Sequence, residues 1–149
     1  MTPTQPDGPV MGVVGVGFGP SNLALAVALQ VHNERSLGKD ALSAVFYERQ
    51  PRFGWHRGML IEGATMQSSF LKDLTTLRNP TSEYGFLSYL HSKGRLVDFV
   101  NHKVLFPTRV EFHDYLEWIA AKFEHLVTYD AEVVGMRPVV EDATVQYVD

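Results

Sequence analysis

The N-terminal part of the chain changes hydrophobic pattern at a glycine-rich turn. A short apolar run ends at Gly15 and predicts a buried parallel strand; it comprises Val10, Met11, Val13 and Val14. From Pro20 the apolar positions continue without a breaker, which predicts a helix that ends near residues 32–33. Ser43–Tyr47 predicts a second strand that ends at Glu48. Strand, glycine-rich turn, helix and strand in this order form a βαβ unit, whose crossover is almost always right-handed.

The clearest helical signal follows Thr108. Thr108 and Glu111 have the spacing of a capping box, in which each residue satisfies a free backbone N–H at the start of a helix. The next apolar side chains recur at helical spacing and predict a one-sided amphipathic helix: Phe112, Tyr115, Leu116, Ile119 and Phe123. Ser82–His91 predicts a shorter helix that Gly94 ends. Three later segments predict strands: Val127–Tyr129, Glu132–Val134 and Thr144–Val148.

Gln50–Asn79 shows neither a helical nor a strand period. It is rich in Trp, Met, Phe and Gly, and polar residues stand among its apolar ones. A long irregular stretch inside a compact domain is usually functional. We therefore expect side chains with chemical roles in this stretch.

Composition places the chain in the ordinary globular class. It has 149 residues, 45% of them hydrophobic and 20% charged, which suits a single domain over residues 10–149. Residues 1–9 are polar and proline-rich, and are expected to form a flexible leader. The chain has no cysteine, which excludes disulfides, thiolate metal sites and cysteine nucleophiles, and fits a cytoplasmic protein.

Charge and hydropathy narrow the possible partners. The formal net charge is −4, and the excess of acidic residues lies after Thr75. Because no run of basic residues occurs, neither nucleic acid nor an anionic membrane surface is expected as a partner. The longest apolar run, Leu23–Leu29, is far shorter than the ~20 residues that a membrane span needs.

The turn Gly15-Val16-Gly17-Phe18-Gly19-Pro20 resembles the dinucleotide fingerprint, with proline in its last position. Glycines allow the tight turn and let the backbone approach a pyrophosphate, which the N-terminus of the following helix also attracts. Glu48, at the end of the second strand, can accept hydrogen bonds from ribose hydroxyls, and its charge would repel a 2′-phosphate. FAD or NAD is therefore favoured over NADP. The alternatives are a purely structural strand–helix turn and, for Glu48, a surface charge.

More specific motifs occur in order after the turn. They are Tyr47-Glu48-Arg49, Trp55-His56, Gly58-Met59-Leu60, Met66-Gln67, Ser69-Phe70-Leu71-Lys72-Asp73-Leu74, Arg78-Asn79-Pro80-Thr81-Ser82 and Phe106-Pro107-Thr108-Arg109. Together they resemble the N-terminal part of the flavin-dependent N-hydroxylating monooxygenases, the L-ornithine N5- and L-lysine N6-monooxygenases of siderophore and related pathways. The resemblance covers roughly Val10 to Val134. It implies an α/β fold: the N-terminal fragment of a Rossmann-like FAD-binding domain, within a flavoprotein that has two dinucleotide-binding domains.

The resemblance also implies roles for individual residues. The FAD pyrophosphate would lie against the turn, at Gly15, Gly17, Gly19, Pro20 and Ser21. Glu48 would bind the adenosine ribose, and the backbone of Val133 would contact the adenine side. The flavin would be lined by Arg49, Trp55, His56 and Met66. Gln67 would lie beside the isoalloxazine ring where oxygen is activated, and Lys72 would pair with the substrate α-carboxylate; these two are the candidate catalytic residues.

Each of the polar candidates has a structural alternative. Lys72 could simply pair with Asp73, Gln67 could be a satisfied core amide, and His56 could be a packed hydrogen-bonding residue. No metal site is expected, because His91, His102, His113 and His125 show no metal-ligand spacing within a carboxylate cluster. A hydrolase has little support, since Ser21 and Ser69 lack triad partners.

The resemblance implies FAD- and NADPH-dependent hydroxylation of the side-chain amine of L-ornithine by molecular oxygen. Leu77–Ser82 favours ornithine over L-lysine. No second glycine-rich turn follows Gly19, so the NADPH domain is expected in the remainder of the enzyme chain, and the enzyme is expected to be a homo-oligomer. The alternatives are a non-catalytic nucleotide-binding module and a different flavin oxidoreductase, and the Phe-Leu-Lys-Asp-Leu segment counts against the second.

Overall fold

A computed structural model describes residues 9–36, 39–141 and 144–148, so residues 1–8 of the expected leader lie outside the described residues. The helices are α1 (Pro20–Arg35), α2 (Phe86–Ser92), α3 (Leu96–Asn101) and α4 (Arg109–Ala120). The strands are β1 (Val13–Val16), β2 (Ala44–Tyr47), β3 (Val127–Thr128), β4 (Pro138–Glu141) and β5 (Thr144–Val148). Three short 3₁₀ helices are η1 (Arg57–Met59), η2 (Phe70–Lys72) and η3 (Ala121–Leu126).

The predicted βαβ unit is confirmed. β1 and β2 pair in parallel with Gly15 opposite Phe46, and α1 connects them. β3 joins β2 on its other side, also in parallel, so the sheet order is β1-β2-β3 and β2 is central. Because the three strands are parallel, their carboxyl ends meet at one edge of the sheet, where Gly17 N–H donates to Tyr47 O and Glu48 N–H donates to Thr128 O.

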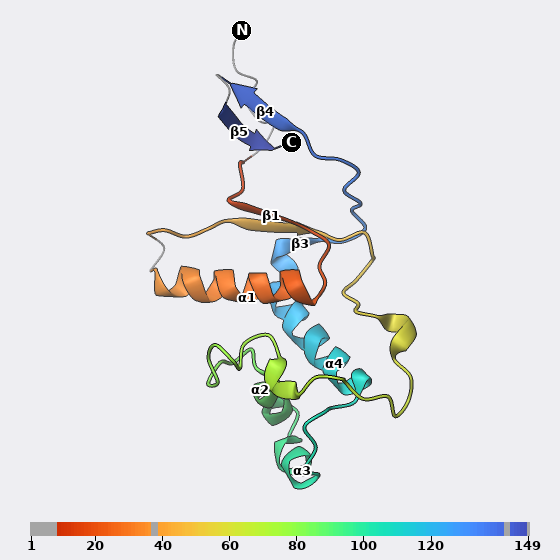
Figure 1. The fold of residues 1–149 in the computed structure, drawn as a ribbon. Helices are drawn as coiled ribbons and strands as arrows, with labels where there is room; N and C mark the ends of the chain where they lie inside the picture. The colour runs from red at the N-terminus through yellow and green to blue at the C-terminus, as the bar shows by residue number, and fades with distance from the viewer. Residues whose placement is uncertain (1–8, 37–38, 142–143, 149) are drawn as a thin grey trace.

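The helices of the α/β body lie on one side of this sheet: α1 runs directly beneath it, and α4 packs on α1 and extends away from the sheet (Figure 1). Ala44 and Phe46 of β2 face them and are buried. Val14 and Val16 of β1 point the other way and are 55% and 52% exposed. The prediction of a buried strand is therefore wrong for β1 within the described residues. It is an edge strand, and no described helix covers its outer face.

An aromatic core between the sheet and the helices fixes the position of α4. Its predicted apolar face is buried, and Tyr115, Leu116 and Ile119 have no exposed surface. Phe86 of α2 stacks on Phe112 with ring centroids 5.7 Å apart and contacts Tyr115 edge-on at 5.4 Å. Thr108 caps α4 as predicted, with its hydroxyl oxygen accepting from Glu111 N–H at 3.1 Å. The Glu111 side chain, however, forms an ion pair with Arg95 (2.5 Å) instead of completing the capping box.

Several element boundaries differ from those predicted. Glu132–Val134 forms no strand; the strand that pairs with β5 is β4, four residues further on, and this antiparallel hairpin stands apart from the parallel sheet (Figure 1). The helix expected from Ser82 begins only at Phe86, because the Ser82 side chain accepts from Tyr84 N–H and holds a turn there. α3 was not predicted. None of the described helices is long and apolar enough to cross a membrane.

Candidate functional site

The three glycines of the turn have different structural requirements. A Cβ on Gly15 would overlap the ring of Phe46, so this position must be glycine for packing. Gly17 has φ +79°, a left-handed conformation that only glycine adopts without strain. Gly19 has neither constraint: its φ is −87°, and a Cβ there would meet no described atom within 4 Å. Within the described residues, neither packing nor backbone conformation therefore requires glycine at position 19, and the space beside it is open.

That open space lies at the N-terminus of α1, which has no side-chain cap. The first helical hydrogen bond runs from Leu23 N–H to Gly19 O, so the amides of Ser21 and Asn22 have no acceptor among the described residues. The Asn22 side chain instead donates to the carbonyls of Val16 (3.2 Å) and Gly17 (2.7 Å) and fixes the turn. Free amides at a helix N-terminus bind anions. Pyrophosphate therefore fits this position.

Glu48 closes the turn from the end of β2. It is only 9% exposed, which contradicts the alternative of a surface charge. One carboxylate oxygen accepts from Phe18 N–H at 2.6 Å and the other from Gln50 N–H at 2.9 Å. Since each carboxylate oxygen has two lone pairs, one acceptor site on each remains for a hydroxyl donor such as ribose.

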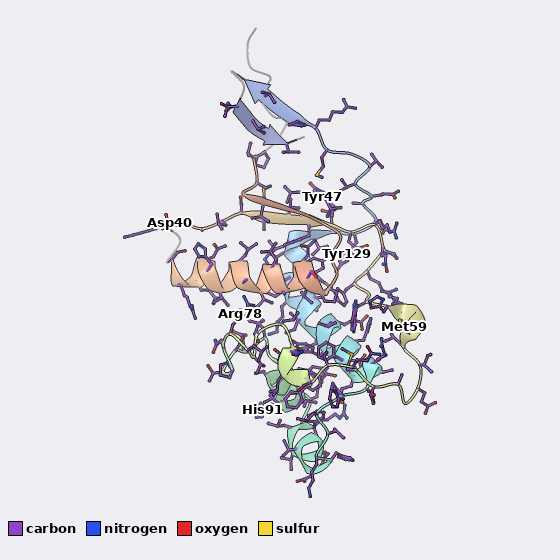
Figure 2. All side chains as sticks on the ribbon, viewed as in Figure 1. Asp40, Tyr47, Met59, Arg78, His91 and Tyr129 are labelled. Atoms are coloured by element: carbon purple, nitrogen blue, oxygen red, sulfur yellow. The ribbon has the colours of Figure 1, made fainter. Side chains whose placement is uncertain are left out.

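The segment after β3 lies beside this strand end. Ala131 N–H donates to Glu48 O and Asp130 N–H donates to Gln50 O, which brings Val133, partly buried, to the same edge of the sheet. Tyr129 lies there as well (Figure 2), and burial raises the pKa of its hydroxyl, with further increases from Glu124 and Glu48. Arg49 is exposed. The edge thus holds one buried carboxylate and a neutral phenol.

The second group of candidates is held by the start of α4. Trp55 packs on Phe112 with ring centroids 6.2 Å apart. Met66 N–H donates to Pro107 O at 2.8 Å, and Thr65 pairs with Thr108 in an isolated antiparallel bridge. Gln67, next to these anchored residues, is exposed, which contradicts the alternative of a satisfied core amide.

His56 and Lys72 are also exposed. His56 has φ +45°, a strained conformation for a residue other than glycine, and its ring contacts Trp55 at 5.0 Å. The His56 ring is thus exposed but packed on Trp55, which is compatible with the packed alternative. Lys72 ends η2, and within the described residues its ammonium has no carboxylate partner. The alternative pairing with Asp73 is therefore not observed.

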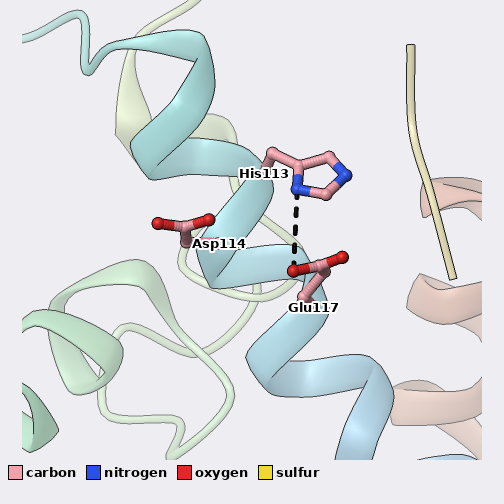
Figure 3. Close-up of side chains that lie close together, drawn as sticks. All are labelled: His113, Asp114 and Glu117. Atoms are coloured by element: carbon pink, nitrogen blue, oxygen red, sulfur yellow. Dashed lines mark ion pairs between the residues drawn. The ribbon is translucent and has the colours of Figure 1, made fainter. Parts of the chain in front are cut away.

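The four histidines discussed for metal binding do not converge. His91 lies at the opposite end of the molecule from Tyr47 and the sheet (Figure 2). His113 is the exception: it is 5% exposed, and its Nδ1 lies 3.9 Å from Glu117 Oε2, with Asp114 nearby (Figure 3). The possible ligand atoms of these three residues lie within 4.8 Å of one another.

This grouping corrects the expectation that no histidine belongs to a carboxylate cluster. The surface hollow that Asp114 and Glu117 line is also lined by Lys93 and Arg95. Two cations in the same hollow disfavour a bound metal ion. We therefore assign no metal ion to this cluster.

The structure thus arranges the candidates in two groups on one scaffold. The turn and Glu48 lie at the carboxyl edge of the sheet, with Val133 in the segment that follows β3. Trp55 and Met66 are anchored at the start of α4, by Phe112 and Pro107, and Gln67 and the turn that carries Lys72 follow them along the chain. Ring contacts connect the groups: Phe18 of the turn lies 6.3 Å from Phe53, which lies 6.1 Å from His113 of α4.

Two positioning residues, Asn22 and Asp73, were missed from the sequence. An Asn two residues after Pro20 carries little signal, because amide side chains are common at helix starts. Asp73, with threonines two and three residues on at Thr75 and Thr76, does carry the pattern of an Asx turn, in which the carboxylate accepts from backbone N–H groups at those positions.

Comparison with known proteins identifies similar chains. Residues 9–148 match the family model described as L-lysine 6-monooxygenase/L-ornithine 5-monooxygenase. An L-ornithine N(5)-monooxygenase of Burkholderia cepacia is 58% identical over 130 residues, which are 87% of this chain and 28% of that protein.

Two solved structures share the fold. The ornithine N-hydroxylase of Kutzneria sp. 744, solved with reduced FAD, NADP⁺ and L-ornithine, superposes with a TM-score of 0.81 at 53% identity, over 89% of this chain and 31% of that one. The ornithine hydroxylase PvdA of Pseudomonas aeruginosa superposes with a TM-score of 0.87 at 44% identity, over 94% of this chain and 33% of that one. The chain spans about a third of the length of these relatives.

Proposed function

This chain belongs to the L-lysine 6-monooxygenase/L-ornithine 5-monooxygenase family, and on that premise we propose that it forms the FAD-binding turn and part of the amino-acid site of an enzyme that hydroxylates the side-chain amine of L-ornithine. The observation that carries the FAD assignment is the open position at Gly19 beside the uncapped N-terminus of α1. Neither packing nor backbone conformation requires glycine there, so the close approach of a ligand is the reason that remains.

The residues at the carboxyl edge of the sheet fit FAD part by part. The amides of Ser21 and Asn22 would hold the pyrophosphate, with Gly19 leaving room for it, and Glu48 would accept from the adenosine ribose hydroxyls. A buried carboxylate would repel a 2′-phosphate, so NADPH is assigned no site on the described part of this chain. When bound, FAD would supply the redox chemistry between NADPH and oxygen, and the residues named here would hold it.

The side chains of the irregular segment Trp55–Lys72 would handle the amino acid. Lys72 presents an exposed ammonium, a point charge suited to the substrate α-carboxylate. Gln67 offers both a donor and an acceptor without ionising, which suits it to orient polar groups beside the flavin ring. Trp55, packed on Phe112, and the anchored Met66 would exclude water from the reacting amine.

The overall reaction balances as amine, O₂, NADPH and a proton giving hydroxylamine, water and NADP⁺. The amine must be neutral to attack an oxygen atom, so low pH should slow the reaction. Ornithine is favoured over lysine because the similar proteins named above act on ornithine by name and because Leu77–Ser82 resembles the ornithine branch. A chain without cysteine is consistent with a cytoplasmic enzyme.

The test uses the natural gene product that contains these residues. Its visible spectrum, NADPH oxidation and hydroxylamine formation are measured with L-ornithine and with L-lysine. We expect flavin absorbance and ornithine-dependent hydroxylamine. Flavin without hydroxylamine would favour a nucleotide-binding module, equal or better turnover of lysine would overturn the substrate assignment, and absence of flavin would overturn the function altogether.

A further inference from the structure

Asp73 follows Lys72 and is the most heavily hydrogen-bonded side chain in the irregular part of the structure. One of its oxygens accepts from the backbone N–H of Thr75 (2.9 Å) and of Thr76 (2.6 Å). The other accepts from the Thr76 hydroxyl (2.7 Å) and from Phe86 N–H (2.7 Å) at the start of α2. The carboxylate therefore ties the turn that carries Lys72 to a helix that begins 13 residues later.

These four bonds leave the Asp73 carboxylate no free lone pair to accept a hydrogen bond from Lys72. An ionised carboxylate offers about four lone-pair sites, and here each receives a donor. Without these four bonds, the Asp73 carboxylate would be available to form an ion pair with the neighbouring Lys72 ammonium. Within the described residues Lys72 has no acidic partner, so its ammonium stays available at the surface.

A second contact holds the next residue. Leu74 N–H donates to the Tyr115 hydroxyl at 3.3 Å, and that hydroxyl donates to Tyr84 O at 2.8 Å. Burial raises the pKa of Tyr115, so the phenol remains neutral and can fill both roles. Gly85, the residue before α2, lies beside Asp73: a Cβ there would be in ordinary van der Waals contact with Asp73 Oδ2, at 3.5 Å. The turn therefore has little freedom to move.

We propose that Asp73 is a positioning residue for substrate binding: it fixes the turn at Lys72 and, with its own lone pairs occupied, leaves the Lys72 ammonium free for the α-carboxylate of the amino acid. The inference rests on the proposed function, because it needs Lys72 to bind substrate. Asp73 itself contacts no substrate, and acts only through the placement of Lys72.

The test compares variants in the full-length, FAD-loaded enzyme. Asp73→Asn keeps the size of the side chain but replaces one carboxylate oxygen by an NH₂ group. That group cannot accept the hydrogen bond from Phe86 N–H. Loss of one charge-assisted hydrogen bond should raise KM for L-ornithine about tenfold, with kcat and FAD content unchanged. Asp98→Asn, on exposed α3, is the matched control for the change of charge and should leave KM unchanged.

The double variant Lys72→Ala/Asp73→Asn separates positioning from a structural role. If Asp73 acts through Lys72, adding Asp73→Asn to Lys72→Ala should raise KM no further. Independent effects that multiply would overturn the proposal. If Lys72→Ala alone leaves KM unchanged, the role of Lys72 in the proposed function fails instead, and the two failures are thereby distinguished.

A milder variant keeps the proposal testable if Asp73→Asn does not fold. Thr76→Val removes one of the four bonds and leaves the carboxylate in place. We expect a smaller rise in KM, about threefold for one neutral donor, again with kcat and FAD content unchanged. A fall in kcat or in FAD content without a change in KM would contradict the positioning role.

Discussion

The turn at Gly15–Pro20 and the segment Trp55–Asp73 are both candidate binding regions, but they are held in different ways. The turn is held by its own backbone conformation at Gly17 and by the paired strand β2, through the packing of Gly15 on Phe46 and the bond from Phe18 N–H to Glu48. The segment has little regular structure, and α4 and α2 hold it through contacts with residues far along the chain, such as Asp73 with Phe86. The comparison teaches that the proposed cofactor site is held within one βαβ unit, whereas the proposed substrate site is held by helices further along the chain.

A substitution in the turn should destabilise the fold where the turn is tightly packed. Gly15→Ala puts a methyl group into the buried ring of Phe46, in the parallel pair β1–β2. We expect a loss of about 3 kcal/mol in the free energy of unfolding, the upper range for overpacking, and loss of FAD with it. Denaturant unfolding followed by circular dichroism measures this, and unchanged stability would show that the ring can move aside.

Changes in the segment should affect substrate and not cofactor. Lys72→Ala removes the exposed ammonium, and loss of a charge-assisted contact of about 2 kcal/mol should raise KM for L-ornithine about thirtyfold. Steady-state kinetics measures KM, and the flavin spectrum reports FAD content. Equal loss of both would mean that the two regions are not separable.

The distant anchors can be tested without touching a binding residue. Tyr115→Phe removes the hydroxyl that joins Leu74 N–H to Tyr84 O and leaves both groups without this partner. We expect about 1–2 kcal/mol of destabilisation from the unsatisfied groups, together with a rise in KM and no change in FAD affinity. Thermal unfolding and kinetics measure the two effects; weaker FAD binding would contradict the separation.

The smallest effect is expected at the start of α4. Thr108→Ala removes the cap whose hydroxyl oxygen accepts from Glu111 N–H, at a cost of about 1 kcal/mol. Thr108→Ser keeps the cap and is the matched control, with stability close to that of the natural protein. A loss in the serine variant as large as in the alanine variant would assign the effect to the methyl group.

The same difference explains what could be predicted from the sequence. The βαβ unit, the glycine turn and the buried face of α4 follow from local periodicity and glycine spacing, and they are confirmed. The exposure of Val14 and Val16 could not be predicted, because an apolar run does not reveal which faces of a sheet are covered. Likewise, Glu132–Val134 has strand-forming residues but no described strand beside it.

Much less of the segment Trp55–Asp73 could be predicted from local sequence patterns. Its candidate side chains come from a family resemblance and not from any hydrophobic period, since Trp55, Gln67 and Lys72 belong to no helical or strand pattern. The start of α2 was misplaced by four residues because the Ser82 side chain holds a turn before it and because Asp73, distant in sequence, supplies an acceptor to Phe86 N–H. Contacts of this kind are visible only once the chain is folded.

The most direct test of the FAD assignment is Gly19→Ala, measured for both stability and flavin binding in the full-length enzyme. A Cβ at this position meets no described atom within 4 Å and the backbone φ is ordinary, so the free energy of unfolding without flavin should remain within about 0.5 kcal/mol of the natural value. The methyl group would occupy the space reserved for the pyrophosphate, and FAD affinity should fall at least about tenfold, the equivalent of 1.4 kcal/mol. Unchanged FAD affinity in a stable Gly19→Ala variant would contradict the claim that this turn holds the cofactor.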